Sequence, residues 1–126
     1  MKNSNAYLDL IISACKKISD YISGQDESGF FNHSIVQSAV IMQLQVIGEI
    51  AKKIDEKTRS EVDVSWKMII GLRNIIAHDY FALDVKSIWH IASVNIPDLE
   101  SKLHGYLAEH DTKYLPPFDD DTPLLG

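Results

Sequence analysis

The sequence is poor in cysteine. Of its 126 residues only Cys15 carries a thiol, which excludes a disulfide framework or a cysteine metal cluster within one chain. Because Cys15 lies among apolar residues at helical spacing, we expect it to be a small, buried hydrophobic side chain.

Long apolar runs are missing as well. No uninterrupted run reaches the roughly 18 residues that a membrane span needs. Asp9 interrupts the apolar stretch after the basic start, which favours a helix of the mature protein over a signal peptide. We therefore expect a cytoplasmic chain that has no membrane partner.

An excess of basic residues is also lacking. The formal net charge is −6, which taken alone argues against nucleic acid as a partner. The distribution is uneven, because residues 109–126 carry a net charge of −4 and residues 52–73 a net charge of +2. On charge alone, residues 52–73 are best interpreted as a solvated helix end of mixed charge.

Strand-like alternation and internal repeats are absent, whereas helical periodicity is strong. Apolar residues step by three and four from Tyr7 to Ile22, which predicts a first helix that ends before Gly24. A polar connector follows over residues 24–29. A second, central helix begins near Asn32 or Ser34 and runs to about Asp55, and residues 55–65 form a polar loop or a short helical turn.

The second half of the chain continues this pattern. Ser65 is the expected N-cap of a third helix and Asp84 that of a fourth. Pro97 predicts a kink or a break near Asn95, before a last helical segment that ends near Leu107. We thus expect an all-α bundle of four to five helices over residues 1–108 and an acidic, proline-containing tail over residues 109–126.

The stretch "RNIIAHDY", residues 73–80, concentrates the candidate chemistry. Arginine binds phosphate oxygens through a bidentate fork, and histidine exchanges a proton near neutral pH. The pair suits cleavage of an RNA phosphodiester, in which the ribose 2′-hydroxyl attacks; DNA lacks that hydroxyl. From residue types alone, an ordinary helix end with a polar rim remains the simpler interpretation.

Helix geometry limits how these groups meet. Arg73 and Tyr80 would share a face if the helix ran through both, whereas His78 lies about 140° around the axis from Arg73. For the three to converge, the backbone must bend, the helix must end inside "IIAHD", or a second chain must supply the missing group.

Three segments resemble the HEPN superfamily, and specifically its HepT branch. "GLRNIIAHDYFALD" matches the pattern of arginine, four residues, histidine, one residue and tyrosine. "QVIGEIAKKI", residues 45–54, is similar to the second-helix segment of the family, and Trp66 followed by Gly71-Leu72 fits the approach to the motif. The resemblance covers roughly residues 5–108.

This resemblance implies a bundle that forms a homodimer through the motif-bearing helix, and a metal-independent endoribonuclease toxin of a type VII toxin–antitoxin pair. Arg73 would stabilise the phosphate, His78 would be the acid–base group and Asn74 would orient the pair. Tyr80 would line the site and receive AMP from an MNT-type nucleotidyltransferase, the antitoxin. The substrate would be RNA, such as tRNA or mRNA, and no cofactor is implied.

Other polar residues have weaker claims. Glu49 and Asp79 are possible supporting residues, although carboxylates near basic groups are usually structural. The remaining histidines show no metal-ligand spacing, so we expect no metal site; they are His33, His90, His104 and His110. Two other functions stay open: a catalytically inactive helical dimer that docks the nucleotidyltransferase, and a structural bundle whose motif only caps an interface.

Overall fold

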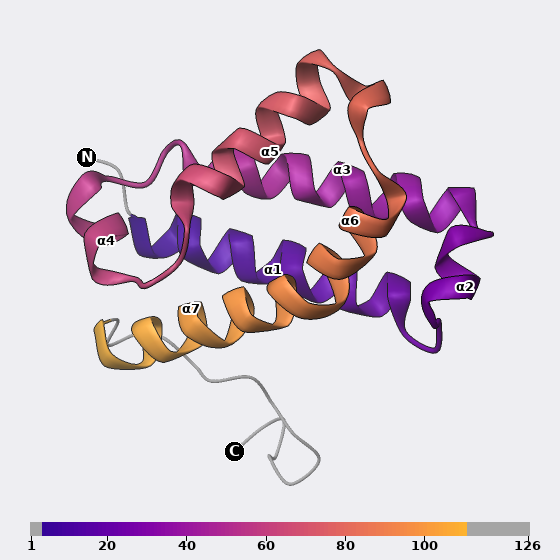
Figure 1. The fold of residues 1–126 in the computed structure, drawn as a ribbon. Helices are drawn as coiled ribbons and strands as arrows, with labels where there is room; N and C mark the ends of the chain where they lie inside the picture. Colours follow the sequence, from indigo (N-terminus) through magenta and orange to yellow (C-terminus); the bar gives the residue numbers. More distant parts are fainter. Residues whose placement is uncertain (1–3, 111–126) are drawn as a thin grey trace, which may run out of the picture.

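Four long helices build the molecule in the computed structural model, which describes residues 4–110. They are α1 (Ser4–Ile22), α3 (Ser34–Ala51), α5 (Trp66–His78) and α7 (Ile96–His110). Figure 1 shows them in the spatial order α5, α3, α1, α7, and α3 and α1 accordingly contact a long helix on either side. No strand occurs within residues 4–110, so the predicted all-α bundle is confirmed. Nearly all of the predicted acidic tail lies outside the described residues.

The core fills the space between these helices. Cys15 is fully buried, as expected of a small hydrophobic side chain, and burial raises the pKa of its thiol to about 12. Apolar side chains that α1, α3 and α7 project inward surround it; they include Leu8, Ile11, Ile18, Leu44, Ile47, Leu103 and Leu107. The periodic apolar positions in the sequence therefore face this core.

The predicted polar connector is in part helical. Gly24 ends α1 with a φ of 79°, a conformation that glycine adopts without strain. The short helix α2 (Glu27–Phe31) follows, and the Asp26 carboxylate caps it by accepting a hydrogen bond from the N–H of Gly29 at 2.7 Å. The predicted polar connector over residues 24–29 is therefore helical from Glu27 onward.

The start of the central helix agrees with the prediction, but its end does not. α3 begins at Ser34, but it ends at Ala51 rather than near Asp55. The Asp55 carboxylate instead caps a further short helix, α4 (Glu56–Glu61), by accepting from the N–H of Thr58 at 2.7 Å. Because that carboxylate also accepts from Ser4 Oγ at 2.9 Å, Asp55 joins α4 to the start of α1.

The irregularity expected near Asn95 is a π-helical stretch. Asp84 caps α6 (Val85–His90) as predicted, through the N–H of Lys86. The wider turn η2 (Ile91–Asn95) then leads directly into α7. Pro97 cannot donate to a carbonyl one turn earlier, and π turns occur mostly as single turns inside α-helices, so the helix widens here without ending.

The composition of α3 is unusually apolar for a helix of this length. It is the one described helix whose length and mean hydropathy would also suit a membrane span. In this fold α3 packs between α1 and α5, and that central position accounts for the apolar residues that it buries, whereas Ile35 and Met42 are exposed.

Candidate active site

The site is built where α3 and α5 cross. At this crossing Gly48 of α3 faces Arg73 of α5. A Cβ at position 48 would lie 2.9 Å from Arg73 Cγ and closer still to Arg73 Cβ. Only glycine therefore allows the arginine stem to lie flat against α3, and the Arg73 side chain is only 19% exposed as a result. Sequence reasoning did not single out Gly48; the available signal was a glycine inside an otherwise apolar helix.

Two polar side chains hold the Arg73 guanidinium. Glu49, the residue after Gly48, forms an ion pair with Nη2. Nη1 donates a hydrogen bond to Asn74 Oδ1 at 3.0 Å. The structure thus brings together three of the residues that the sequence singled out.

The guanidinium keeps unused donors. It carries five N–H groups in a planar fork, and Glu49 and Asn74 each engage one terminal nitrogen. Nε is buried without a hydrogen-bond partner in the described part of the chain. Because Nε is shielded from solvent, the second N–H of Nη1 and that of Nη2 are the donors suited to an oxyanion such as a phosphate oxygen.

His78 and Tyr80 lie apart from this cluster. α5 ends at His78, because Asp79 leaves the helix with a φ of −151° while its N–H still donates to the Ile75 carbonyl at 2.8 Å. Of the three routes to convergence, the helix end inside "IIAHD" is the one observed. Tyr80 starts a 3₁₀ turn, η1 (Tyr80–Ala82), so it does not continue the helical face of Arg73.

The helix end does not complete the site within one chain. His78 and Asp79 are exposed, and Tyr80 is 47% exposed. Among residues 4–110, no hydrogen bond or ion pair joins either His78 or Tyr80 to Arg73. The same residues hold no group of three or more potential metal ligands.

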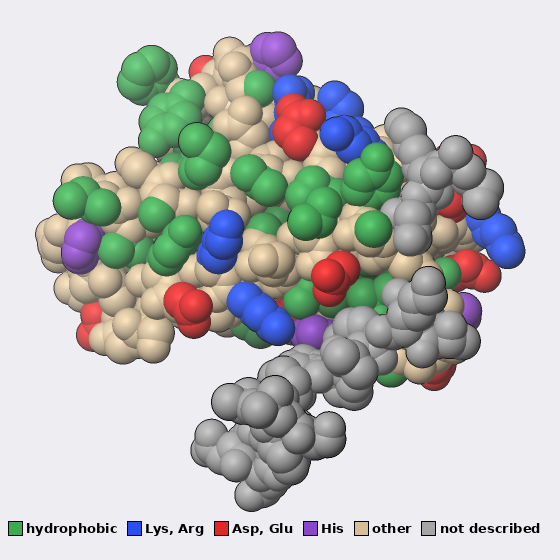
Figure 2. All heavy atoms as spheres, turned by 180° about the vertical axis from the view of Figure 1, so that it is seen from behind, with side chains coloured by type: hydrophobic (Ala, Val, Ile, Leu, Met, Phe, Trp, Pro, Cys, Tyr) green, Lys and Arg blue, Asp and Glu red, His purple; other side chains and the backbone are tan. Residues whose placement is uncertain are grey.

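Apolar side chains surround the motif on the surface. Figure 2 shows hydrophobic side chains spread over one face of the molecule, with basic and acidic groups clustered beside them. Met68, Ile75 and Phe81 are among the large exposed apolar residues, and Phe81 is 96% exposed. A groove of about 670 Å³ runs between α5 and α7 over the floor formed by α3, and its walls are mainly aliphatic. Exposed apolar surface of this extent indicates an interaction face.

Comparison with known proteins finds a family and relatives that are described as ribonucleases. The model of a family described as "Ribonuclease HepT-like" matches residues 11–104. A "Putative RNase" of Methanocaldococcus jannaschii is 29% identical over 81% of this chain and 94% of its own length. A "Putative RNase" of Caldanaerobacter subterraneus is 29% identical over 85% of this chain and 96% of its own.

A third relative is a "Probable ribonuclease HepT" of Thermococcus cleftensis. It is 31% identical over 81% of this chain and 94% of its own length. No solved structure matches the chain. The matched region contains α3, α5 and the whole of the Arg73 cluster.

Proposed function

Because the chain belongs to the HepT-like ribonuclease family, we propose that it is a metal-independent endoribonuclease toxin whose reaction uses the ribose 2′-hydroxyl. The observation that carries this proposal is the Arg73 guanidinium, held by Glu49 and Asn74 with one N–H of each terminal nitrogen still unused, five residues before an exposed histidine. Cytoplasmic RNA, such as tRNA or mRNA, is the proposed substrate.

The chemistry follows from these groups. A histidine base removes the proton of the 2′-hydroxyl while the oxygen attacks the phosphorus. Arg73 binds the phosphorane oxygens, and preorganised donors of this kind often contribute more to catalysis than any other single effect. The P–O5′ bond breaks, and a protonated histidine supplies the proton to the leaving oxygen. The products are a 2′,3′-cyclic phosphate and a free 5′-hydroxyl.

One molecule does not offer all of these groups in one place. His78 lies about 140° around the α5 axis from Arg73, so a second chain could supply the histidine that one chain holds away from its own arginine. We therefore propose a homodimer in which the motif-bearing helices face each other. The exposed apolar residues of α5 and η1, among them Ile75 and Phe81, support this arrangement, and two-fold dimers are the commonest oligomers.

The test uses purified, unmodified protein and total RNA. Arg73→Ala and His78→Ala should each remove most of the cleavage, because each deletes a side chain that is proposed to stabilise the transition state. His90→Ala is a matched control, since that histidine is also exposed near a helix end. Cleavage that a chelator abolishes and magnesium restores would contradict the metal-independent mechanism.

Regulation by an AMP-transferring antitoxin is a separate part of the proposal. The Tyr80 side chain is partly exposed and sits two residues after His78, so an AMP group on its hydroxyl would bring a phosphate close to the motif. A neutral phenol is a weak nucleophile, so an MNT-type nucleotidyltransferase would have to activate the Tyr80 hydroxyl.

Co-expression with such a transferase should add one or more AMP units to the peptide that contains Tyr80, as measured by mass spectrometry. Tyr80→Phe should lose this addition. Attachment at Tyr106 instead, or undiminished RNA cleavage by the modified protein, would refute this part.

A second candidate is an inactive dimer that only docks the transferase. The net charge of −6 and the Glu49 carboxylate beside Arg73 favour it. Formation of the complex without RNA cleavage by the unmodified protein would decide for it.

A further inference from the structure

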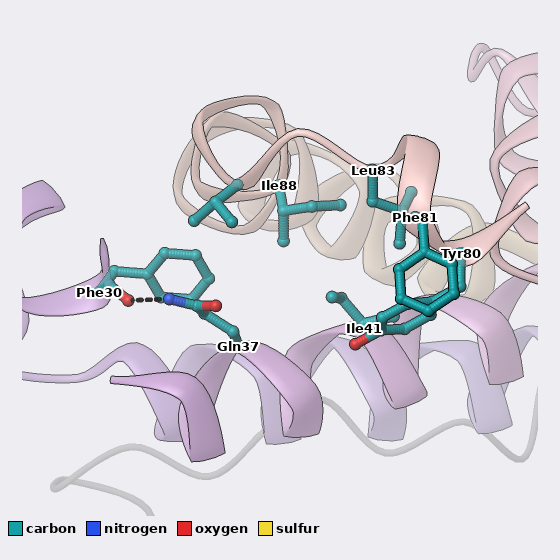
Figure 3. Close-up of a pocket in the computed structure, with 8 residues that line it drawn as sticks. Phe30, Gln37, Ile41, Tyr80, Phe81, Leu83 and Ile88 are labelled. Atoms are coloured by element: carbon teal, nitrogen blue, oxygen red, sulfur yellow. Dashed lines mark hydrogen bonds between the residues drawn. The ribbon is translucent and has the colours of Figure 1, made fainter. Parts of the chain in front are cut away.

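A small cavity opens beside the motif, between α2 and α3 on one side and η1 and α6 on the other (Figure 3). Its volume is about 200 Å³, which is smaller than a typical drug-sized pocket and suits a single planar ring system. The lining is almost entirely apolar or aromatic; it consists of Phe30, Gln37, Ile41, Tyr80, Phe81, Leu83, Val85 and Ile88.

Gln37 and the Tyr80 hydroxyl are the polar groups of this lining, and the orientation of the Gln37 amide is fixed. Its Nε2 donates to the carbonyl oxygens of Phe30 at 2.8 Å and Phe31 at 3.0 Å. Both partners are pure acceptors, so the amide nitrogen must face them and cannot exchange places with Oε1. Figure 3 shows Oε1 on the side of the Gln37 amide that faces Tyr80, across the cavity. At the position of Gln37 the cavity therefore presents a hydrogen-bond acceptor.

Aromatic rings form the walls around this acceptor. Phe30 is fully buried, and its ring is backed by Trp89 at a centroid distance of 5.2 Å. Tyr80 and Phe81 lie on the opposite side, with their rings edge to face at 6.0 Å. Aromatic side chains are the usual stacking surfaces for unpaired bases, and Phe81 is 96% exposed.

We propose that this cavity binds a nucleobase whose outer edge carries an amino group, adenine or cytosine. The amino group would donate to Gln37 Oε1 while the ring packs among the aromatic walls. Uracil and guanine present a carbonyl oxygen at the same edge, which would oppose the Gln37 acceptor. Tyr80 belongs both to the motif and to the cavity wall, so the base is a neighbour of the scissile phosphate. This inference rests on the proposed ribonuclease function.

The nucleobase in this cavity could also come from a second source. An AMP unit attached to Tyr80 would carry its adenine next to this cavity, where it would occupy the base subsite. Both sources require the same acceptor and the same aromatic walls, and they differ in whether the base arrives on RNA or on Tyr80.

The first experiment maps cleavage of a random-sequence RNA pool by sequencing the new 5′-hydroxyl ends. Wild-type protein should prefer adenine or cytosine at one fixed position near the cut, by about three- to tenfold for one hydrogen bond. Gln37→Leu should abolish this preference. Phe81→Ala should raise KM more than it lowers kcat, and light scattering should report the same oligomeric state as for the wild type, because Phe81 also belongs to the proposed dimer face. Leu10→Ala, another exposed apolar residue outside the cavity, should change neither.

The second experiment does not depend on cleavage. Resonances of the cavity residues are followed by NMR while AMP, CMP, UMP or GMP is added to the protein. AMP and CMP should shift them at concentrations where UMP and GMP do not, and Gln37→Leu should remove the difference. Protein carrying AMP on Tyr80 should no longer bind free AMP if the linked adenine is an occupant; continued binding would assign the cavity to RNA alone.

The outcomes separate the two proposals. Selective nucleotide binding without RNA cleavage would support the cavity and refute the ribonuclease. RNA cleavage without base preference, together with equal or absent binding of all four nucleotides, would overturn the cavity proposal and leave the ribonuclease intact.

Discussion

Gly48 determines how the candidate catalytic arginine is presented. Its missing side chain allows Arg73 to rest on α3, and the next residue, Glu49, then reaches the guanidinium. The orientation of Arg73 is thus set by two consecutive residues of a different helix. A small change at the crossing should therefore disturb activity and stability together.

Gly48→Ala should destabilise the protein by about 1–3 kcal/mol, the usual range for overpacking. Alanine is the better helix former by about 1 kcal/mol, but that gain is too small to offset a clash with the arginine stem. RNA cleavage should fall as Arg73 is displaced. Urea unfolding followed by circular dichroism measures the first effect, and initial rates measure the second.

Gly105→Ala is the matched control for this prediction. Gly105 also lies within a helix, but a Cβ there would meet nothing within 4 Å. The substitution should stabilise the protein by roughly 0.5–1 kcal/mol and leave cleavage unchanged. Equal effects at positions 48 and 105 would show that the α3–α5 crossing tolerates a side chain.

Cys15 should make stability depend on alkaline pH. Burial, with a smaller contribution from the charge of Glu100, raises the pKa of the thiol to about 12, against about 8.5 in an unfolded chain. Above pH 8.5 the unfolded state loses a proton that the folded state keeps, so stability falls as pH rises toward 12. Between pH 7 and pH 10 the loss should be on the order of 1–2 kcal/mol.

Urea unfolding at the two pH values measures this loss. Tyrosines and lysines titrate in the same range, so Cys15→Ala serves as the reference. The alanine variant should be less stable at pH 7 but should lose less stability on going to pH 10. An identical loss in both proteins would mean that the thiol does not contribute.

At the scale of elements, the sequence predicted the helices whose signals are local. The start of α3 and the caps of α5 and α6 coincide with Ser34, Ser65 and Asp84, because apolar periodicity and capping residues act over one turn. Ser65 occupies the N-cap position of α5, although its side chain makes no capping hydrogen bond.

The incorrect predictions have physical reasons. α2 has only five residues, which is too short for periodicity to appear. The predicted end of α3 was four residues late because Ile54 is buried just as a helical position would be, although the helix has already ended. A buried position needs an apolar side chain whether or not it is helical. The apolar pattern in the sequence can therefore continue past the residue where the helix ends.

The site was predicted only in part for a similar reason. The motif gave the family correctly and drew attention to Arg73, Asn74 and Glu49, which the structure brings together. The role of Gly48 depends on which helices cross and at which residue, and that is a tertiary property. The end of α5 inside the motif was also open, since no glycine or proline marks it.

At the scale of the whole molecule, exposed apolar surface gathers around α5. Its C-terminal turn and η1 carry exposed apolar residues, and the groove beside it is lined by aliphatic side chains. The polar groups of the motif lie within this surface. A second copy that covers it would bury apolar area and bring two sets of motif residues together, which is the proposed dimer.

Subunit mixing tests that dimer. If each site takes Arg73 from one chain and His78 from the other, Arg73→Ala and His78→Ala proteins should complement each other. Random reassociation makes half of the dimers mixed, and each mixed dimer has one intact site of two. Two-fold symmetry therefore predicts recovery of about a quarter of the wild-type rate.

The controls use each variant alone. Each is unfolded and refolded without the other, where it should stay inactive, and light scattering should report a dimer in every sample. If the mixture stays as inactive as its components while dimers exchange, then Arg73 and His78 act within one chain, and the bend that would join them must form when RNA binds.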